Sequence, residues 1–140
     1  DRSSGSRRAR AAEGHEPLVW HSEFGLEAAA QVAEGLLRSP QAPDALVVLD
    51  DFMAMGVVLA ARRCEVSVPG QLGLVSFNDS RLCDLLECGL TSVSLNLDEI
   101  VRVAIDRLMQ LVDGRELSGG RRTLIQSSLR VRGSSRGPAC

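Results

Sequence analysis

Short apolar runs that alternate with segments of helical spacing most constrain the fold of this chain. The runs are DALVVL at 44–49 and LGLVSF at 72–77, each with the length of a strand that is covered on both faces. Apolar residues recur every three or four positions over 51–63 and over 97–112, which is typical of amphipathic helices. This alternation predicts an α/β domain with a parallel sheet and right-handed crossovers.

Shorter elements complete the expected order. Over 22–38 the alanines and leucines share one helical face, and Ser22 is the expected N-cap. Gly114 stands just beyond the helix at 97–112 and is a typical stop signal. The further expected elements are a strand at 16–20, the helix at 22–38, a short helix or irregular link at 80–87, and strands at 91–95, 122–127 and 128–134.

The length of 140 residues suits one domain. Residues 15–135 are expected to form this domain, and residues 136–140 are a tail. Residues 1–14 are polar and rich in arginine, so composition alone predicts a disordered start.

Composition argues against several functions. The net charge is −2, whereas phosphate binding needs a basic face, so this segment is not expected to bind nucleic acid by itself. No uninterrupted apolar run is long enough to cross a membrane. Cys64, Cys83, Cys88 and Cys140 fit no zinc spacing, and we expect reduced thiols in a cytoplasmic protein without a metal or a cofactor.

Each of the two apolar runs ends at a pair of acid or amide side chains: Asp50-Asp51 and Asn78-Asp79. Ligands of parallel sheets bind beyond the carboxyl ends of the strands, so Asp50 and Asn78 are expected to face one cleft and to bind a hydroxyl-rich small molecule. Helix capping is the alternative, and Asp51 and Asp79 are the better candidates for it. A Mg²⁺ or phosphoryl site is disfavoured because the chain has no lysine.

Three stretches carry a family resemblance: PDALVVLDDFMAMGVVLAARRCEVSVPGQLGLVSFNDS, LTSVSLNLDEIVRVAIDRLMQLVDG and SLRVRGSS. In this order and spacing they resemble the effector-binding domain of lactose-repressor-type transcription regulators. The resemblance covers about residues 15–135. It implies the fold of periplasmic sugar-binding proteins, a three-layer α/β arrangement with a parallel sheet and helices on both faces, present here mostly as its C-terminal lobe.

The resemblance also implies ligand contacts outside the two pairs. DRSSGSRRAR is similar to the family's Ser-rich turn, and on this register Arg10 is the ligand arginine, with Ser4 and Ser6 beside it. A guanidinium fork clamps two sugar hydroxyls or a carboxylate. Trp20 stands where the family has an aromatic residue at the pocket mouth; stacking on a sugar and packing in the core are both open roles for it.

The chain departs from the family pattern at three positions. Asp50 stands where asparagine is common, and Asn78 stands where aspartate is common, so the two chemistries are exchanged. A carboxylate only accepts hydrogen bonds, which favours ligands rich in donors and disfavours anionic ones. Leu95 replaces a polar hinge residue, so a typical hexose specificity is not expected to carry over.

Two parts of the family pattern have no counterpart in the sequence. One is the DNA reader, an N-terminal helix-turn-helix followed by a hinge helix. The other is most of the first lobe, and we expect a break in the pattern near residues 11–15. The helix at 97–112 normally belongs to that lobe, so we expect its apolar stripe to need another cover, such as a second copy of the chain.

The expected function is effector sensing in a bacterial transcription regulator. A sugar or sugar derivative would bind and shift the population towards a closed form, and a homodimer would pass this shift to operator DNA through the missing N-terminal domain. The expected dimer residues are Met55, Leu59, Leu82 and Leu85, with packing on their own sheet as the alternative. The alternative function is a periplasmic sugar-binding protein of an ABC transporter.

An enzyme is not expected. The sequence has no Gly-x-Ser-x-Gly elbow, and its two histidines, His15 and His21, have no evident nucleophile partner.

Overall fold

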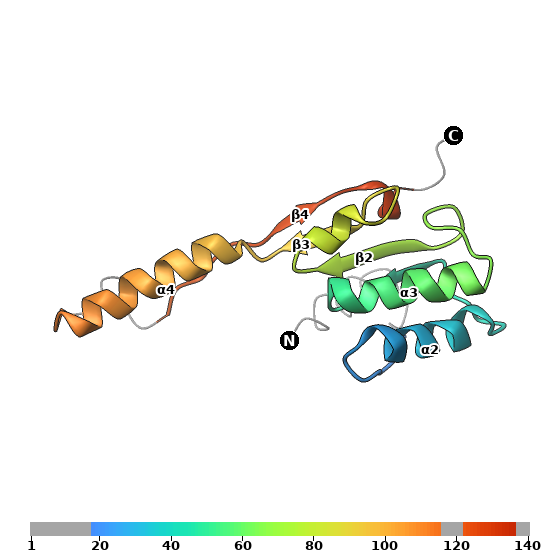
Figure 1. Cartoon of the computed structure of the whole chain (residues 1–140), viewed down its shortest axis with the longest axis horizontal. Helices are drawn as coiled ribbons and strands as arrows, with labels where there is room; N and C mark the ends of the chain where they lie inside the picture. Colours follow the sequence, from blue (N-terminus) through green and yellow to red (C-terminus); the bar gives the residue numbers. More distant parts are fainter. Residues whose placement is uncertain (1–17, 116–121, 137–140) are drawn as a thin grey trace.

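The computed structural model describes residues 18–115 and 122–136 (Figure 1). The helices expected at 51–63 and 97–112 are confirmed with the same bounds. The elements are α2 (Leu26–Leu37), β1 (Ala45–Val47), α3 (Asp51–Arg63), β2 (Gly73–Phe77), η1 (Arg81–Asp84), β3 (Thr91–Ser94), α4 (Leu97–Val112), β4 (Ser128–Arg130) and η2 (Gly133–Ser135).

The four strands form one mixed sheet in the order β1-β2-β3-β4. The first three strands are parallel, and Ser76 of β2 lies opposite Ser92 of β3. β4 is antiparallel to β3, with Leu129 opposite Val93, so one antiparallel edge strand joins the expected parallel sheet. The chain leaves β3 into α4 and returns beside it, which reverses the direction of β4 (Figure 1).

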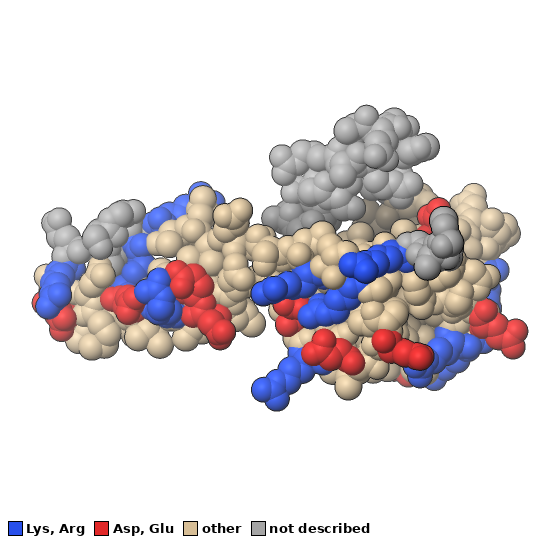
Figure 2. All heavy atoms as spheres, turned by 90° about the horizontal axis from the view of Figure 1, so that it is seen from above, with Lys and Arg blue, Asp and Glu red and all other residues tan. Residues whose placement is uncertain are grey.

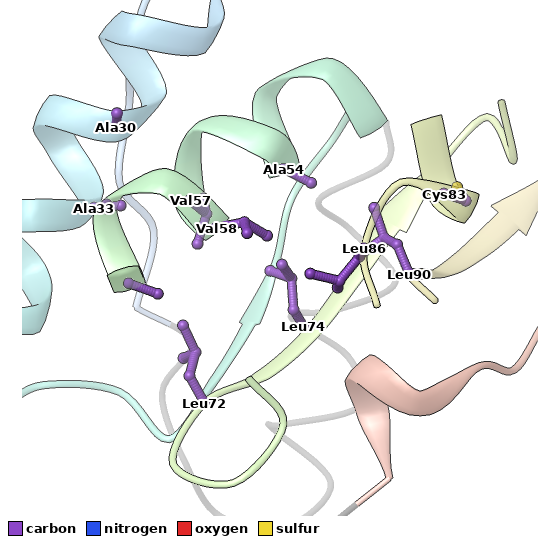
Figure 3. Packing of buried hydrophobic residues seen from close by; sticks show 12 residues of the cluster. Ala30, Ala33, Ala54, Val57, Val58, Leu72, Leu74, Cys83, Leu86 and Leu90 are labelled. Carbon is purple, nitrogen blue, oxygen red and sulfur yellow. The ribbon is translucent and has the colours of Figure 1, made fainter. Parts of the chain in front are cut away.

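Small residues let α2 pack closely on α3, which in turn packs on the sheet. Ala33 of α2 and Ala54 and Val57 of α3 belong to one buried cluster with Leu72 and Leu74 (Figure 3). Burial of this apolar surface contributes roughly 25 cal/mol per Å² removed from water. The cluster therefore fixes α3 on the sheet and holds its first residues at the sheet's downstream edge.

Helices on both faces of the sheet are expected, and the described residues show them on one face only. α3 packs on β2, and α2 packs on α3. On the opposite face Val47 and Leu129 are 54% and 56% exposed, since alternate strand residues point away from α3. The α/β class and the parallel order of β1, β2 and β3 are confirmed.

α4 extends away from the body of the molecule (Figure 1). None of its residues is buried, and the apolar side chains of Val101, Ile105 and Leu108 are all more than half exposed. Its exposed apolar stripe agrees with the expectation that this helix needs a cover; packing on a second copy stays a prediction. Acidic and basic side chains lie interspersed over α4 on the face drawn in Figure 2. Arg102 of this helix pairs with Glu99 and Asp106.

Three local expectations are wrong. Residues 18–20 form no strand and are exposed, because β1 is the edge strand and takes no partner from them. Residues 122–127 form no strand because they run beside α4, where Thr123 and Gln126 accept hydrogen bonds from Arg107 and Asn96. Gly25, not Ser22, is the N-cap of α2.

Within residues 18–115 and 122–136, no helix has the length and apolar character needed to cross a membrane.

Candidate functional site

Asp50 and Asn78 meet at the downstream edge of the parallel strands. Asn78 Nδ2 donates to Asp50 Oδ2 at 2.6 Å, and both side chains are half-buried. β1 and β2 are adjacent and parallel, so the residues that follow them emerge at the same edge. The two residues predicted to share a cleft are therefore in direct contact; their binding of a ligand stays a prediction.

Acceptors outnumber donors in this pair. Asp50 Oδ1 accepts from the backbone N–H of Phe52 at 2.8 Å, and Oδ2 accepts from Asn78. Carboxylate oxygens accept more than one hydrogen bond each, and the side-chain carbonyl of Asn78 is a further acceptor. The arrangement suits a ligand that presents hydroxyl or amino donors.

The expected helix-capping roles of Asp51 and Asp79 are wrong. Asp50, not Asp51, is the N-cap of α3, because its side chain reaches the first turn from an extended backbone (φ −155°, ψ 143°). Asp79 caps no helix either, since Ser80 precedes η1 and makes no side-chain cap there. Asp50 thus both caps α3 and contacts Asn78.

Asp51 is the buried centre of a hydrogen-bond network and is 1% exposed. Its carboxylate accepts from Ser76 Oγ at 2.5 Å, from Ser92 Oγ at 2.8 Å and from the backbone N–H of Ser80 at 2.7 Å. Burial alone would raise the pKa of Asp51, but these hydrogen bonds outweigh it and hold the pKa below its ordinary value. The network ties α3 to β2, β3 and the loop after β2.

Sequence reasoning missed Ser76 and Ser92. The available signal was a serine at an inward position of each of two apolar strands, VSF and SVS. A buried hydroxyl needs a partner, so such serines predict a polar side chain between the sheet and its covering helix.

The backbone after β2 is held in an uncommon conformation. Asn78 and Asp79 have φ values of 102° and 53°, which L-residues rarely adopt and which cost on the order of 1–3 kcal/mol each. Two hydrogen bonds hold this turn: Asn78 N–H donates to Val93 O at 2.9 Å, and Asp79 N–H donates to Ser92 Oγ at 3.0 Å. The turn directs Asn78 towards Asp50.

Asp79 is anchored by an arginine that sequence reasoning also missed. Arg132 Nη2 lies 2.8 Å from Asp79 Oδ1, and only 14% of the Asp79 side chain is exposed. The hydrogen bond from Arg132 to Asp79 raises the pKa of the guanidinium further above its ordinary value. The stretch SLRVRGS predicts a strand and carries part of the family resemblance, and its two arginines were the available signal for such a pair.

The other predicted ligand residues are only partly placed. Ser4, Ser6 and Arg10 lie outside the described residues. Trp20 is 39% exposed, so the alternative of a core tryptophan does not hold. An exposed aromatic pair that was not predicted lies at the start of the helices: the rings of Phe24 and Phe52 are 6.2 Å apart.

The predicted dimer residues divide into two kinds. Met55 and Leu59 are half-buried and pack against the core cluster, so the alternative of packing on their own sheet accounts for part of their surface. Leu82 is half-buried, whereas Leu85 is 71% exposed. An interface at these residues stays a prediction.

A surface hollow lies away from the Asp50–Asn78 pair. It has a volume of about 460 Å³ and is lined by Val58, Arg62, Val68 and Glu87, among others. Within the part of the chain that the structure describes, no group of His, Cys, Asp and Glu is arranged to hold a metal ion.

Cys83 is expected to resist alkylation in the folded protein. It is fully buried, and burial, with the charge of Asp51, raises the pKa of its thiol to about 11. Iodoacetamide at pH 8, followed by peptide mass spectrometry, should modify Cys83 only after urea is added. Cys64, which is half-buried, serves as the comparison, and equal rates for both thiols in the folded protein would contradict the expectation.

Asp50 and Asn78 lie at the downstream edge of three parallel strands, where sheets of this kind bind ligands. The family described as "Periplasmic binding protein-like domain" matches residues 1–135 of the chain. That match defines the class of the domain and agrees with the confirmed α/β architecture.

Comparison with individual proteins shows to which family within this class the chain belongs. The chain is 34% identical over 92 residues to the lactose operon repressor of Rhizobium radiobacter (66% of this chain, 81% of the relative). It is 32% identical over 118 residues to the HTH-type transcriptional repressor CytR of Escherichia coli (84% and 34%). The chain belongs to the lactose-repressor (LacI/GalR) family, within its effector-binding domain.

A solved structure agrees with this assignment. The LacI family transcriptional regulator from Arthrobacter sp. FB24, in complex with lactose, aligns with a TM-score of 0.81 and 27% identity over 92% of this chain and 48% of that chain. The chain spans about a third of the length of CytR and about half of the Arthrobacter chain. Each of these three relatives is a repressor or a transcriptional regulator.

Proposed function

We propose that the chain is the effector-sensing part of a bacterial transcription regulator, and that its effector is a neutral sugar or sugar derivative. The observation that carries the proposal is the 2.6 Å contact between Asp50 and Asn78 at the edge where parallel sheets bind ligands. The lactose complex of the Arthrobacter regulator supports the sugar class.

The proposed mechanism is a population shift. The effector binds a closed arrangement more tightly than an open one, and the shift is limited to that difference in affinity. Arg10, with Ser4 and Ser6, would complete the hydrogen bonds to the ligand, and Trp20 would stack on its apolar face.

The response would reach DNA through a homodimer. The proposed contact residues are Met55, Leu59, Leu82 and Leu85, and the proposed DNA reader is a helix-turn-helix domain outside this chain. Because a regulator of this kind works on DNA, its compartment would be the cytoplasm. No catalytic step is needed for this function.

Sugar binding is expected to depend on both members of the pair. Asp50→Ser keeps an oxygen for the α3 cap but removes the acceptor of Asn78, and Asn78→Gly removes the amide while glycine tolerates the φ of 102°. Each change should raise the Kd for the best sugar by about ten- to a hundredfold, as expected for a lost hydrogen bond to a charged group. Calorimetric titration with lactose, cellobiose, glucose and galactose measures this.

Glu65→Gly is the matched control. It also removes a side chain at a positive φ (59°), but Glu65 lies at the far end of α3 from the pair. Its Kd should equal that of the unsubstituted protein. An unsubstituted protein that shows neither heat nor a thermal shift with any sugar of the panel would overturn the proposal.

A further inference from the structure

We propose that Arg132 is a positioning residue: acting through Asp79, it fixes the side chain of Asn78 against Asp50. The relevance of this device to effector binding rests on the proposed function. The positioning of Asn78 by Arg132 is a property of the folded chain, and it can be tested without any ligand.

A chain of contacts runs from Arg132 to the pair. Arg132 Nη2 donates to Asp79 Oδ1 at 2.8 Å. Asp79 directly follows Asn78, whose Nδ2 donates to Asp50 Oδ2 at 2.6 Å. A shift of the Asp79 carboxylate therefore moves the backbone that carries the Asn78 amide.

Arg132 is itself held firmly. Its Nη1 donates to Leu90 O at 2.8 Å, and its backbone N–H donates to Thr91 Oγ1 at 2.8 Å. The aliphatic part of the side chain lies over Gly89, where an added Cβ would be 2.9 Å from Arg132 Cδ. Because the backbone and Nη1 of Arg132 are both hydrogen-bonded, the position of Nη2 relative to Asp79 is fixed.

The backbone at the pair needs such support. Asn78 and Asp79 both have positive φ values, 102° and 53°, and consecutive residues of this kind persist only where the surroundings impose them. The backbone N–H groups of this turn bond to Val93, Ser92 and Asp51, but these bonds leave the Asp79 side chain unfixed. Arg132 supplies the close side-chain contact.

Arg130 provides a matched control from the same strand region. Its Nε lies 3.7 Å from Asp79 Oδ2, and its side chain is 65% exposed, against 27% for Arg132. A surface pair of this kind contributes little because solvent screens it and the long side chain stays free. Both arginines place a positive charge near the Asp79 carboxylate, but only Arg132 contacts it closely. Comparing the two variants therefore distinguishes an effect of contact geometry from an effect of charge alone.

The sequence offers a direct readout, because Asn78 and Asn96 are the only asparagines of the 140-residue chain. Selective ¹⁵N-asparagine labelling therefore gives two side-chain amide pairs in an NMR spectrum. Asn96 Nδ2 donates to Gln126 O beside α4, outside the chain of contacts from Arg132 to Asn78, and it reports on folding in the same sample. Asn78→Gly assigns the two signals.

Arg132→Gln is expected to move the Asn78 amide resonances towards those of a free amide and to speed their hydrogen exchange at least tenfold. The Asn96 pair should stay in place, Arg130→Gln should change neither pair, and Arg132→Lys should restore part of the Asn78 shift. Unchanged Asn78 resonances in folded Arg132→Gln protein would overturn the inference. If that variant does not fold, Asp79→Ala, which adds no asparagine signal, is measured in the same way, and an unmoved Asn78 pair in that protein also overturns the inference.

A sugar titration of the same samples separates this inference from the proposed function. Displaced Asn78 resonances together with a tenfold weaker Kd for lactose, or for whichever panel sugar binds, support both. Displaced resonances in a protein that binds no sugar support the positioning role and overturn the proposed function. An unchanged Asn78 signal overturns the positioning role whatever the sugar result.

Discussion

Replacing Gly56 by alanine is expected to lower the free energy of unfolding by about 3 kcal/mol, near the upper end of typical overpacking costs. An added Cβ at this position of α3 would stand 2.1 Å from Leu26 O and 3.1 Å from Ala29 Cβ. The first of these is backbone of α2, which cannot turn aside as a flexible side chain does. The two helices would have to separate, and the alanine contacts between them would weaken. Urea denaturation followed by circular dichroism measures the change.

Gly35→Ala is the matched control for this substitution. Gly35 lies in α2, and an added Cβ there meets nothing within 4 Å. Alanine favours helix over glycine by roughly 1 kcal/mol in a helix interior, so the control should be neutral or stabilising. Opposite signs for the same substitution in two neighbouring helices are the expected outcome. A stabilised Gly56→Ala protein would show that α2 and α3 are not packed as described.

Asp51→Asn is expected to lower the free energy of unfolding by about 3 kcal/mol, because an amide nitrogen replaces an acceptor among buried donors. The Asp51 carboxylate accepts from the hydroxyls of Ser76 and Ser92 and from the N–H of Ser80. Asparagine has nearly the same shape but one acceptor oxygen fewer, so a donor loses its partner. The same urea experiment measures the loss.

Asp106→Asn is the control for the loss of a carboxylate. The Asp106 side chain is 55% exposed and pairs only at the surface of α4, so its change should stay within about 0.5 kcal/mol. Equal losses for the two variants would contradict the role assigned to the buried network.

The loss of unfolding free energy in Asp51→Asn should also depend on pH, since the pKa of Asp51 in the folded protein is below its ordinary value. A depressed folded pKa gives stability that is fully present above the unfolded pKa, about 3.9, and is lost as the pH falls through the folded value. The stability difference between the unsubstituted protein and Asp51→Asn should therefore be constant from pH 7 to about 5. It should shrink as the pH falls below about 4, and urea titrations at each pH test this.

Much of the fold was predictable because it depends on local periodicity. The helices at 51–63 and 97–112 were predicted to the residue, since apolar spacing and a stop glycine are local signals. The predictions of strands at 16–20 and 122–127 were wrong. A strand needs a neighbouring strand to pair with, and the local sequence pattern does not show whether one is present.

The candidate site was half predictable for the same reason. Asp50 and Asn78 follow two apolar runs, so parallel pairing alone brought them to one edge. The roles of Asp51 and Asp79 were wrong because the partners that decide them, Ser92 and Arg132, lie 41 and 53 residues away in sequence. Pairing over such separations depends on how the strands register and not on any local motif.

By itself the sequence determined the α/β class, the extent of the long helices and the identity of the pair at the sheet edge. Only the tertiary structure decided which carboxylate caps α3, which one is buried, and which arginine supports the turn that carries Asn78. Hydrophobic periodicity is a local property of the sequence. The partner of a buried polar group is different, because such a group must form a hydrogen bond, and tertiary packing decides which group lies next to it.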